Sequence, residues 1–115
     1  MSSTGDKAYL SDMLDCAQQV AEFIDGYDEA KYLADRKTQV AVAHMLQTIG
    51  EAAIKVSDPL QLAHPAIDWF KIKGLRHRIV HDYRRINDAT IYRIAREYVP
   101  PLVEQLKKIL AGGVE

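Results

Sequence analysis

Apolar residues recur at steps of three and four along most of the 115-residue chain, and this spacing constrains the fold more than any other feature. Between Asp6 and Asp25 the main apolar positions are separated by steps of 3, 1, 3, 3, 1 and 3, which places them on one face of a helix. No stretch alternates apolar and polar residues in the manner of a half-buried strand. The chain is therefore predicted to be all-α.

Glycines mark the limits and contacts of the first helices. Gly26 is expected to end the first helix in left-handed geometry, and a short helical turn is predicted over residues 28–34. A second long helix is predicted from about Asp35 to Ser57. In that helix Gly50 and its small neighbours would permit close contact with another helix.

Prolines divide the second half of the chain. Asp58-Pro59 and His64-Pro65 bracket a predicted loop, since residues before proline avoid helical geometry. A third helix is expected to end near residue 83 or 84. A fourth, capped by residue 87 or 88, should be kinked at Pro100-Pro101. The prediction is a small up-down bundle of four to five helices.

Charge is unevenly distributed along the chain. The formal net charge is only −1, and such a balance by itself argues against nucleic-acid binding. However, residues 71–96 contain eight basic and two acidic residues, whereas residues 1–70 carry five basic and eleven acidic residues. A concentrated basic segment within a neutral chain is a candidate surface for a polyanion.

Several classes of protein are excluded by simpler features. No apolar run approaches the roughly 18 residues of a membrane span, and residues 1–15 do not resemble a signal peptide. The single cysteine, Cys16, cannot form an internal disulfide, which fits a reducing compartment. We therefore expect one cytoplasmic domain, residues 1–115, without membrane contact.

The densest polar cluster is the segment from Arg76 to Tyr83, which reads Arg-His-Arg-Ile-Val-His-Asp-Tyr. Arg76 and His81 would lie about 140° apart around a helix, as neighbours on its rim. This pair suits RNA cleavage, in which the 2′-hydroxyl of the substrate is the nucleophile. Histidine can accept or donate the proton and a guanidinium can hold the phosphate, without a metal. The alternative at this point is a solvated helix face.

One histidine cannot easily serve as acid and base on opposite sides of a phosphate, so a homodimer with two facing motifs is expected. His77 and His81 also have a spacing that can bind zinc, but no third ligand lies nearby in sequence. Glu51 is expected either to hydrogen-bond the motif helix or to be solvated. Trp69 and Phe70 are expected in the core or in a dimer contact.

The segment Arg76-x4-His81-x-Tyr83 matches the R-x4-H-x-Y signature of the HepT-like toxins, a branch of the HEPN (higher eukaryotes and prokaryotes nucleotide-binding) superfamily. Residues 49–52 resemble the family's I-G-E-A segment, residues 64–69 its P-x-I-x-W stretch, and residues 74–76 its G-x-R. About residues 8–110 follow the pattern.

This resemblance implies an all-α, homodimeric, metal-independent ribonuclease toxin of a type VII-like toxin–antitoxin system, with no cofactor. Arg76 would position the scissile phosphate and His81 would be the general acid/base. His77 stands where the family usually has asparagine, as a helper, a substrate contact or a second acid/base. A minimal nucleotidyltransferase (MNT) antitoxin would transfer AMP to Tyr83, and the added phosphate would repel RNA and block the cleft.

Three more arginines of the basic segment, Arg78, Arg84 and Arg85, are expected to guide RNA by charge. The competing interpretation is a protein without catalysis, namely a nucleotide-binding or structural subunit that partners a nucleotidyltransferase.

Overall fold

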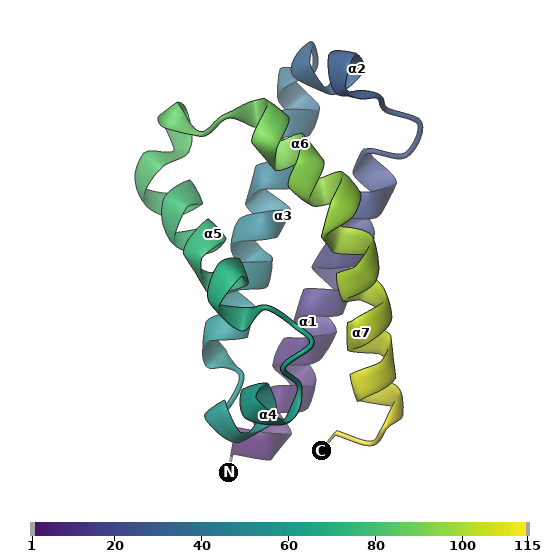
Figure 1. Cartoon of the computed structure of the whole chain (residues 1–115), viewed down its shortest axis with the longest axis vertical. Coiled ribbons are helices and arrows are strands. Elements are labelled where there is room, and N and C mark those ends of the chain that lie inside the picture. Colours follow the sequence, from purple (N-terminus) through teal and green to yellow (C-terminus); the bar gives the residue numbers. More distant parts are fainter. Residues whose placement is uncertain (1, 115) are drawn as a thin grey trace.

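Four long helices make up most of the molecule in the computed structural model, which describes the backbone of residues 2–114 and the side chains of residues 5–114. They are α1 (Ser2–Phe23), α3 (Arg36–Lys55), α5 (Trp69–Asp82) and α7 (Val99–Ala111). α3 packs against both α1 and α5, and α1 packs against both α3 and α7. Figure 1 shows α5 beside α3 on one side of the molecule and α7 on the other.

Shorter elements connect these helices: α2 (Glu29–Leu33), α4 (Asp58–Ala63), the 3-10 turn η1 (Tyr83–Arg85) and α6 (Asp88–Glu97). Residues 2–114 thus form seven α-helices and one 3-10 turn, with no strand. The all-α prediction is confirmed, whereas the expected number of four to five helices is wrong.

Prolines account for the difference in helix number. The segment predicted as a loop contains α4, in which Pro59 occupies the first turn, where its missing N–H is not needed. The prolines at 100 and 101 likewise lie in the first turn of α7, and the helix breaks at Tyr98 rather than bending. A proline that would disrupt a helix interior is tolerated in a first turn.

A buried carboxylate holds the corner between α3 and α4. Ser57, the N-cap of α4, makes no side-chain cap bond of its own. Its N–H and hydroxyl instead donate to the two oxygens of Asp6 on α1, at 2.8 and 2.5 Å. Asp6 is almost fully buried, and it ties α4 to α1 across 51 residues of sequence.

The predicted helix ends are found. Gly26 follows α1 with a φ of 77°, and the Asn87 side chain accepts a hydrogen bond from Thr90 N at the start of α6. Asp35 caps α3 by accepting from Thr38 N, and also accepts from the hydroxyls of Tyr27 and Thr38. These bonds, led by the one from Tyr27, lower the pKa of Asp35 to about 2.

Most of the core comes from three of the long helices, α1, α3 and α7, which we call the frame. From α5 only Trp69 and Ile79 are buried. The indole N–H of Trp69 donates to the carbonyl of His64 at 3.0 Å, which anchors the start of α5. Phe70, in contrast, is 89% exposed, so of its two predicted places the core is wrong and a dimer contact stays a prediction. No helix within residues 2–114 is both long and apolar enough to cross a membrane.

Candidate functional site

The candidate site is built on the C-terminal half of α5, the helix that carries the Arg-x4-His motif. His77 and His81 are exposed, one turn apart, with their ring centroids 4.4 Å from each other. Arg76 lies on the side of α5 that faces α3 and is half-buried. Within residues 5–114 no hydrogen bond or ion pair joins Arg76 to His81.

Arg76 meets α3 at a glycine. A Cβ added to Gly50 would lie 2.2 Å from Cβ of Arg76 and 3.2 Å from the carbonyl oxygen of Ile72. Real Cβ atoms do not approach so closely, so only glycine permits this packing of α5 on α3. The close helix contact predicted at Gly50 is confirmed, and its partner is the motif arginine.

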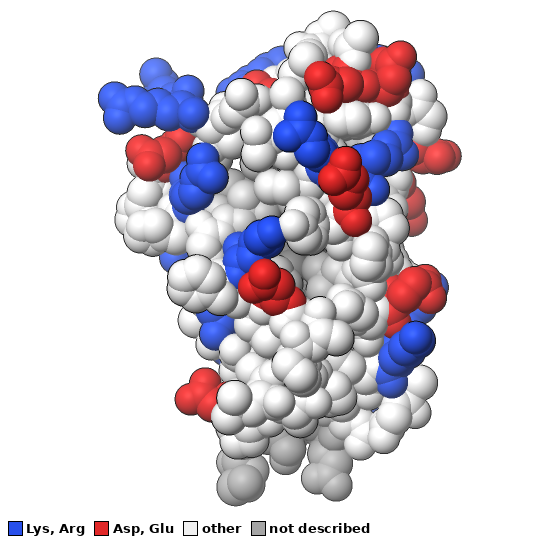
Figure 2. All heavy atoms as spheres, in the orientation of Figure 1, with Lys and Arg blue, Asp and Glu red and all other residues white. Residues whose placement is uncertain are grey.

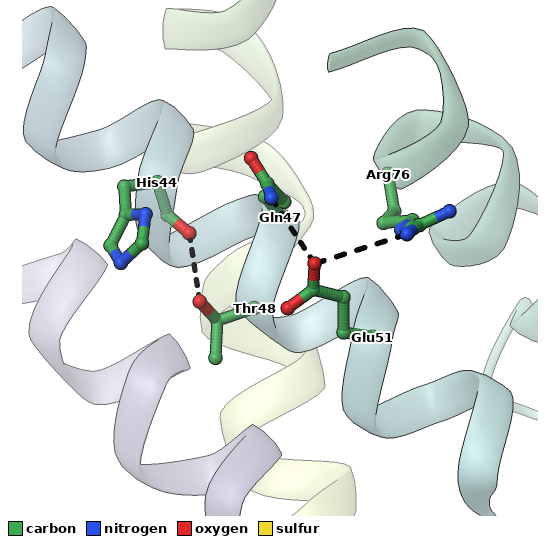
Figure 3. A network of polar contacts seen from close by, with 5 residues as sticks. All are labelled: His44, Gln47, Thr48, Glu51 and Arg76. Carbon is green, nitrogen blue, oxygen red and sulfur yellow. Dashed lines mark hydrogen bonds and ion pairs between the residues drawn. The ribbon is translucent and has the colours of Figure 1, made fainter. Parts of the chain in front are cut away.

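The guanidinium of Arg76 faces a carboxylate on α3. Its Nη2 lies 3.9 Å from Oε2 of Glu51, and the same Oε2 accepts a hydrogen bond from Gln47 Nε2 at 3.1 Å (Figure 3). Nε of Arg76 is buried without a hydrogen-bond partner in the described part of the chain. Of the two expectations for Glu51, contact with the motif helix is correct, through an ion pair rather than a hydrogen bond. Figure 3 also shows His44 on the far side of α3 from Arg76.

Tyr83, the last residue of the motif, begins η1 and turns inward. It is half-buried, and its hydroxyl is enclosed without a hydrogen-bond partner among the described residues. The guanidinium of Arg36 lies 5.3 Å from the centre of its ring. Burial raises the pKa of the neighbouring Tyr32 phenol, and the proximity of Asp88 and Tyr83 raises it further. No sequence signal indicated that this tyrosine packs against α2 and α3.

The basic residues of segment 71–96 include some that are bound to other residues of the protein and some that are exposed. Four of its basic residues have polar or ionic partners within the molecule: Lys71, Lys73, Arg76 and Arg96. Arg96, for example, donates to the carbonyl of Tyr27 and so links α6 to the loop between α1 and α2. The three arginines predicted to guide RNA, Arg78, Arg84 and Arg85, are exposed. Figure 2 shows basic side chains on the upper half of the drawn face, interspersed with acidic ones, whereas its lower half is mostly uncharged.

Two further groups of side chains were compared with what metal binding and nucleophilic attack would need: the histidine pair and Cys16. In the part of the chain that the structure describes, no cluster of three or more His, Cys, Asp and Glu side chains surrounds His77 and His81. Cys16 is buried, and burial together with Asp15 and Asp12 raises the pKa of its thiol, which makes it a poor nucleophile.

A pocket of about 350 Å³ lies between α5 and the α6–α7 segment and was not foreseen from the sequence. Leu46 and Ile49 of α3 line it, and Ile72 and Leu75 of α5 form one side. It forms part of the hollow near the centre of the face in Figure 2. The pocket depends on the angle between α5 and the α6–α7 segment. No local sequence pattern determines that angle.

The fold and the site define an all-helical protein that presents an arginine and two histidines on a helix fixed to its core by a glycine contact. The family described as ribonuclease HepT-like matches residues 13–109, and the chain belongs to this family. The resemblance found in the sequence is thereby confirmed.

Curated relatives match over nearly their full length. The chain is 28% identical over 103 residues to "Probable ribonuclease HepT" of Thermococcus cleftensis, covering 90% of this chain and 94% of that protein. It is 29% identical over 107 residues to "Putative RNase MJ1380" of Methanocaldococcus jannaschii, covering 93% and 98%. No solved structure matches the chain at a significant level.

Proposed function

We propose that this protein is the toxin of a type VII-like HEPN/MNT toxin–antitoxin system, a metal-independent endoribonuclease that acts in the cytoplasm as one domain. The observation that carries the proposal is the placement of the motif. Arg76 is fixed against α3 by the Gly50 contact, while His77 and His81 face solvent on the same helix. The names of the curated relatives, which describe ribonucleases, support the same activity.

In the proposed reaction the substrate RNA supplies the nucleophile. A base removes the proton of the 2′-hydroxyl, O2′ attacks phosphorus, and the bond from phosphorus to O5′ breaks. An acid returns a proton to O5′, which leaves a 2′,3′-cyclic phosphate and a 5′-hydroxyl. His81 transfers protons near neutral pH, and Arg76 stabilises the charge that accumulates on the phosphate oxygens. His77, whose ring lies 4.4 Å from that of His81, is an auxiliary acid/base or substrate contact.

A homodimer would bring a second pair of histidines to the same phosphate. The outer face of α5, formed by Phe70, Gly74, His77 and His81, supports this arrangement, since these residues follow the helical repeat. A Cβ added to Gly74 would meet no atom of the described residues within 4 Å. Glycine inside a helix costs about 1 kcal/mol relative to alanine, and no residue that the structure describes lies close enough to Gly74 to require glycine there. Close approach of a second α5 would account for both Gly74 and the exposed Phe70.

Arg78, Arg84 and Arg85 would bind the RNA backbone beside the motif, because they are exposed and positively charged. Three phosphate contacts to a single strand predict that the logarithm of the binding constant falls with log salt at a slope of roughly −2.

The antitoxin partner is an MNT nucleotidyltransferase that transfers AMP from ATP to Tyr83. The phenol oxygen attacks the α-phosphorus, pyrophosphate leaves, and the phenol proton passes to solvent or a base. Because the Tyr83 hydroxyl is enclosed, we expect η1 to move outward during transfer. The attached phosphate would then keep the turn displaced beside Arg84 and Arg85 and exclude RNA.

Cleavage of RNA in excess chelator tests the catalytic proposal. The wild type is expected to cleave, and His81→Ala to lose at least about 100-fold in rate, the usual contribution of a general acid or base. His44→Ala removes an exposed histidine from the far side of α3 and should cleave like the wild type. Equal cleavage by wild type and His81→Ala would count against His81 as the catalyst. Cleavage by neither protein would also count against His81 and would favour the non-catalytic subunit.

The regulatory proposal is tested by intact mass after incubation with the neighbouring nucleotidyltransferase and ATP. We expect an AMP-sized increment that disappears in Tyr83→Phe and persists in Tyr98→Phe, a matched change at an exposed tyrosine. An increment that survives Tyr83→Phe would place the modification elsewhere.

A further inference from the structure

In the proposed reaction Arg76 has to hold its guanidinium toward a phosphate in a fixed orientation. Residues of α3 that contact Arg76 can restrain it in this way. We infer that Glu51 is a positioning residue for Arg76, held in place by Gln47 and brought within reach by Gly50. The inference rests on the proposed ribonuclease activity and adds to it a second helix, α3, that contributes to the site.

The first step concerns what surrounds the guanidinium. Nε of Arg76 is buried without a partner, and the side chain as a whole is 29% exposed. Its one ionic partner among the described residues is Glu51, with Nη2 3.9 Å from Oε2. A guanidinium has five N–H donors, so pairing with Glu51 leaves others open to a phosphate. The arginine is thus restrained from the protein side while its outer donors remain accessible.

The second step concerns how Glu51 is restrained. Gln47 precedes it by one helical turn and donates to Oε2 at 3.1 Å (Figure 3). Gly50 sets the separation of the two helices, because its missing Cβ allows Arg76 to lie directly against α3. Gln47, Gly50 and Glu51 therefore act as one unit on the face of α3 that α5 covers.

The third step separates positioning from stability. Glu51 is 43% exposed on its side chain, and ion pairs at such exposure contribute only about 0–1 kcal/mol to folding. Misplacement of a group that contacts the reacting atoms by about 1 Å, however, can cost about 100-fold in rate. A carboxylate beside the arginine also weakens ground-state attraction for RNA, because it neutralises part of the positive charge. Glu51 therefore lowers affinity slightly and increases turnover.

Steady-state cleavage by Glu51→Gln tests this directly, because positioning predicts a split between kcat and KM. We expect kcat to fall about 10-fold to 100-fold while KM stays equal or decreases. Glu51→Asp keeps the charge on a side chain one methylene shorter and should retain more activity than Glu51→Gln. Glu104→Gln on α7 is the matched control, because it removes a carboxylate from another exposed ion pair, that with Lys107. We expect it to leave both constants unchanged.

A second readout does not depend on cleavage. The Nε–Hε resonance of Arg76, assigned by its loss in Arg76→Lys, is expected to exchange slowly in the wild type and faster in Glu51→Gln. If the wild type cleaves RNA and Glu51→Gln has an unchanged kcat, the positioning role is refuted while the proposed function stands. If the wild type does not cleave, the proposed function fails. An Arg76 resonance that is then identical in wild type and Glu51→Gln refutes the restraint by Glu51 as well.

Discussion

The frame helices α1, α3 and α7 differ from α5 in how they are held. The frame supplies most of the buried apolar side chains, and Leu10, Met13, Val20 and Leu106 are almost fully enclosed. α5 has 14 residues but buries only Trp69 and Ile79, and its outer face is solvent-exposed. Stability therefore resides in the frame, whereas the placement of the motif depends on a few contacts, chiefly the one at Gly50. Changes in the two regions should have different consequences.

The largest effect on stability is expected in the frame. Leu106→Ala removes a fully buried side chain and should lower the free energy of unfolding by about 2–5 kcal/mol. Activity per folded molecule should stay near that of the wild type, because α7 does not carry the motif. Denaturant unfolding and cleavage assays on the same samples measure both quantities. A stable variant with impaired cleavage would contradict the separation of the two regions.

Two glycine substitutions should distinguish the side of α5 that packs on α3 from its outer side. Gly50→Ala forces a Cβ against Arg76 and should destabilise the protein by about 1–3 kcal/mol, with a loss of cleavage beyond the folded fraction. Gly74→Ala places a Cβ in open space and should stabilise the monomer by up to about 1 kcal/mol. Thermal unfolding of both variants at low protein concentration makes the comparison. Equal destabilisation by both changes would refute the role of Gly50.

The enclosed hydroxyls beneath η1 should make a smaller contribution. Tyr32→Phe and Tyr83→Phe each remove a buried hydroxyl that has no described partner, so neither should destabilise the fold, and each is expected to change it by at most about 1 kcal/mol. Tyr92→Phe is the matched control, because its hydroxyl donates to the carbonyl of Tyr27 at 2.7 Å and its loss should destabilise. Chemical denaturation of the three variants ranks them. A clear loss of stability in Tyr83→Phe would indicate that its hydroxyl is satisfied in the folded protein.

The smallest effect is expected at the cap of α3 and depends on pH. The pKa of Asp35 is lowered to about 2 in the folded protein, so its ionised form stabilises the fold above the pKa of the unfolded chain, near 4. This stabilisation is lost as pH falls through about 2. Asparagine can also cap a helix, so the difference in melting temperature between wild type and Asp35→Asn should shrink from pH 5 to pH 2. A difference that grows on acidification would contradict this role of Asp35.

The sequence specified those parts of the fold that depend on local rules. Gly26 and Asn87 end and begin helices as expected, because left-handed geometry and side-chain capping are local properties. The loop predicted around Pro59 is wrong, because proline disrupts only the interior of a helix. In the first turn of α4 the same residue is compatible with helical geometry. Phe70 lies outside the core, one of its two predicted places, because the inward orientation of Trp69 turns the next residue of the helix about 100° away.

The site was predictable in its residue types but not in its contacts. The motif identified Arg76, His81 and Tyr83, and Gly50 was expected to make a close helix contact. Three contacts depend on how α5 and η1 pack on α3. They are the approach of Gly50 to Arg76, the ion pair between Glu51 and Arg76, and the inward orientation of the Tyr83 hydroxyl. Such packing is set by contacts between residues distant in sequence, which a periodic pattern does not report.

The central claim is that the motif on α5 cleaves RNA through the 2′-hydroxyl of the substrate, and one substitution in the substrate tests it most directly. An oligoribonucleotide is compared, in excess chelator, with the same molecule carrying a single 2′-deoxynucleotide at the mapped cleavage position. We predict cleavage of the first to a 2′,3′-cyclic phosphate and no cleavage of the second at that position. Cleavage of the deoxy-substituted strand at an equal rate, or a product that ends in a 5′-phosphate, would contradict the account.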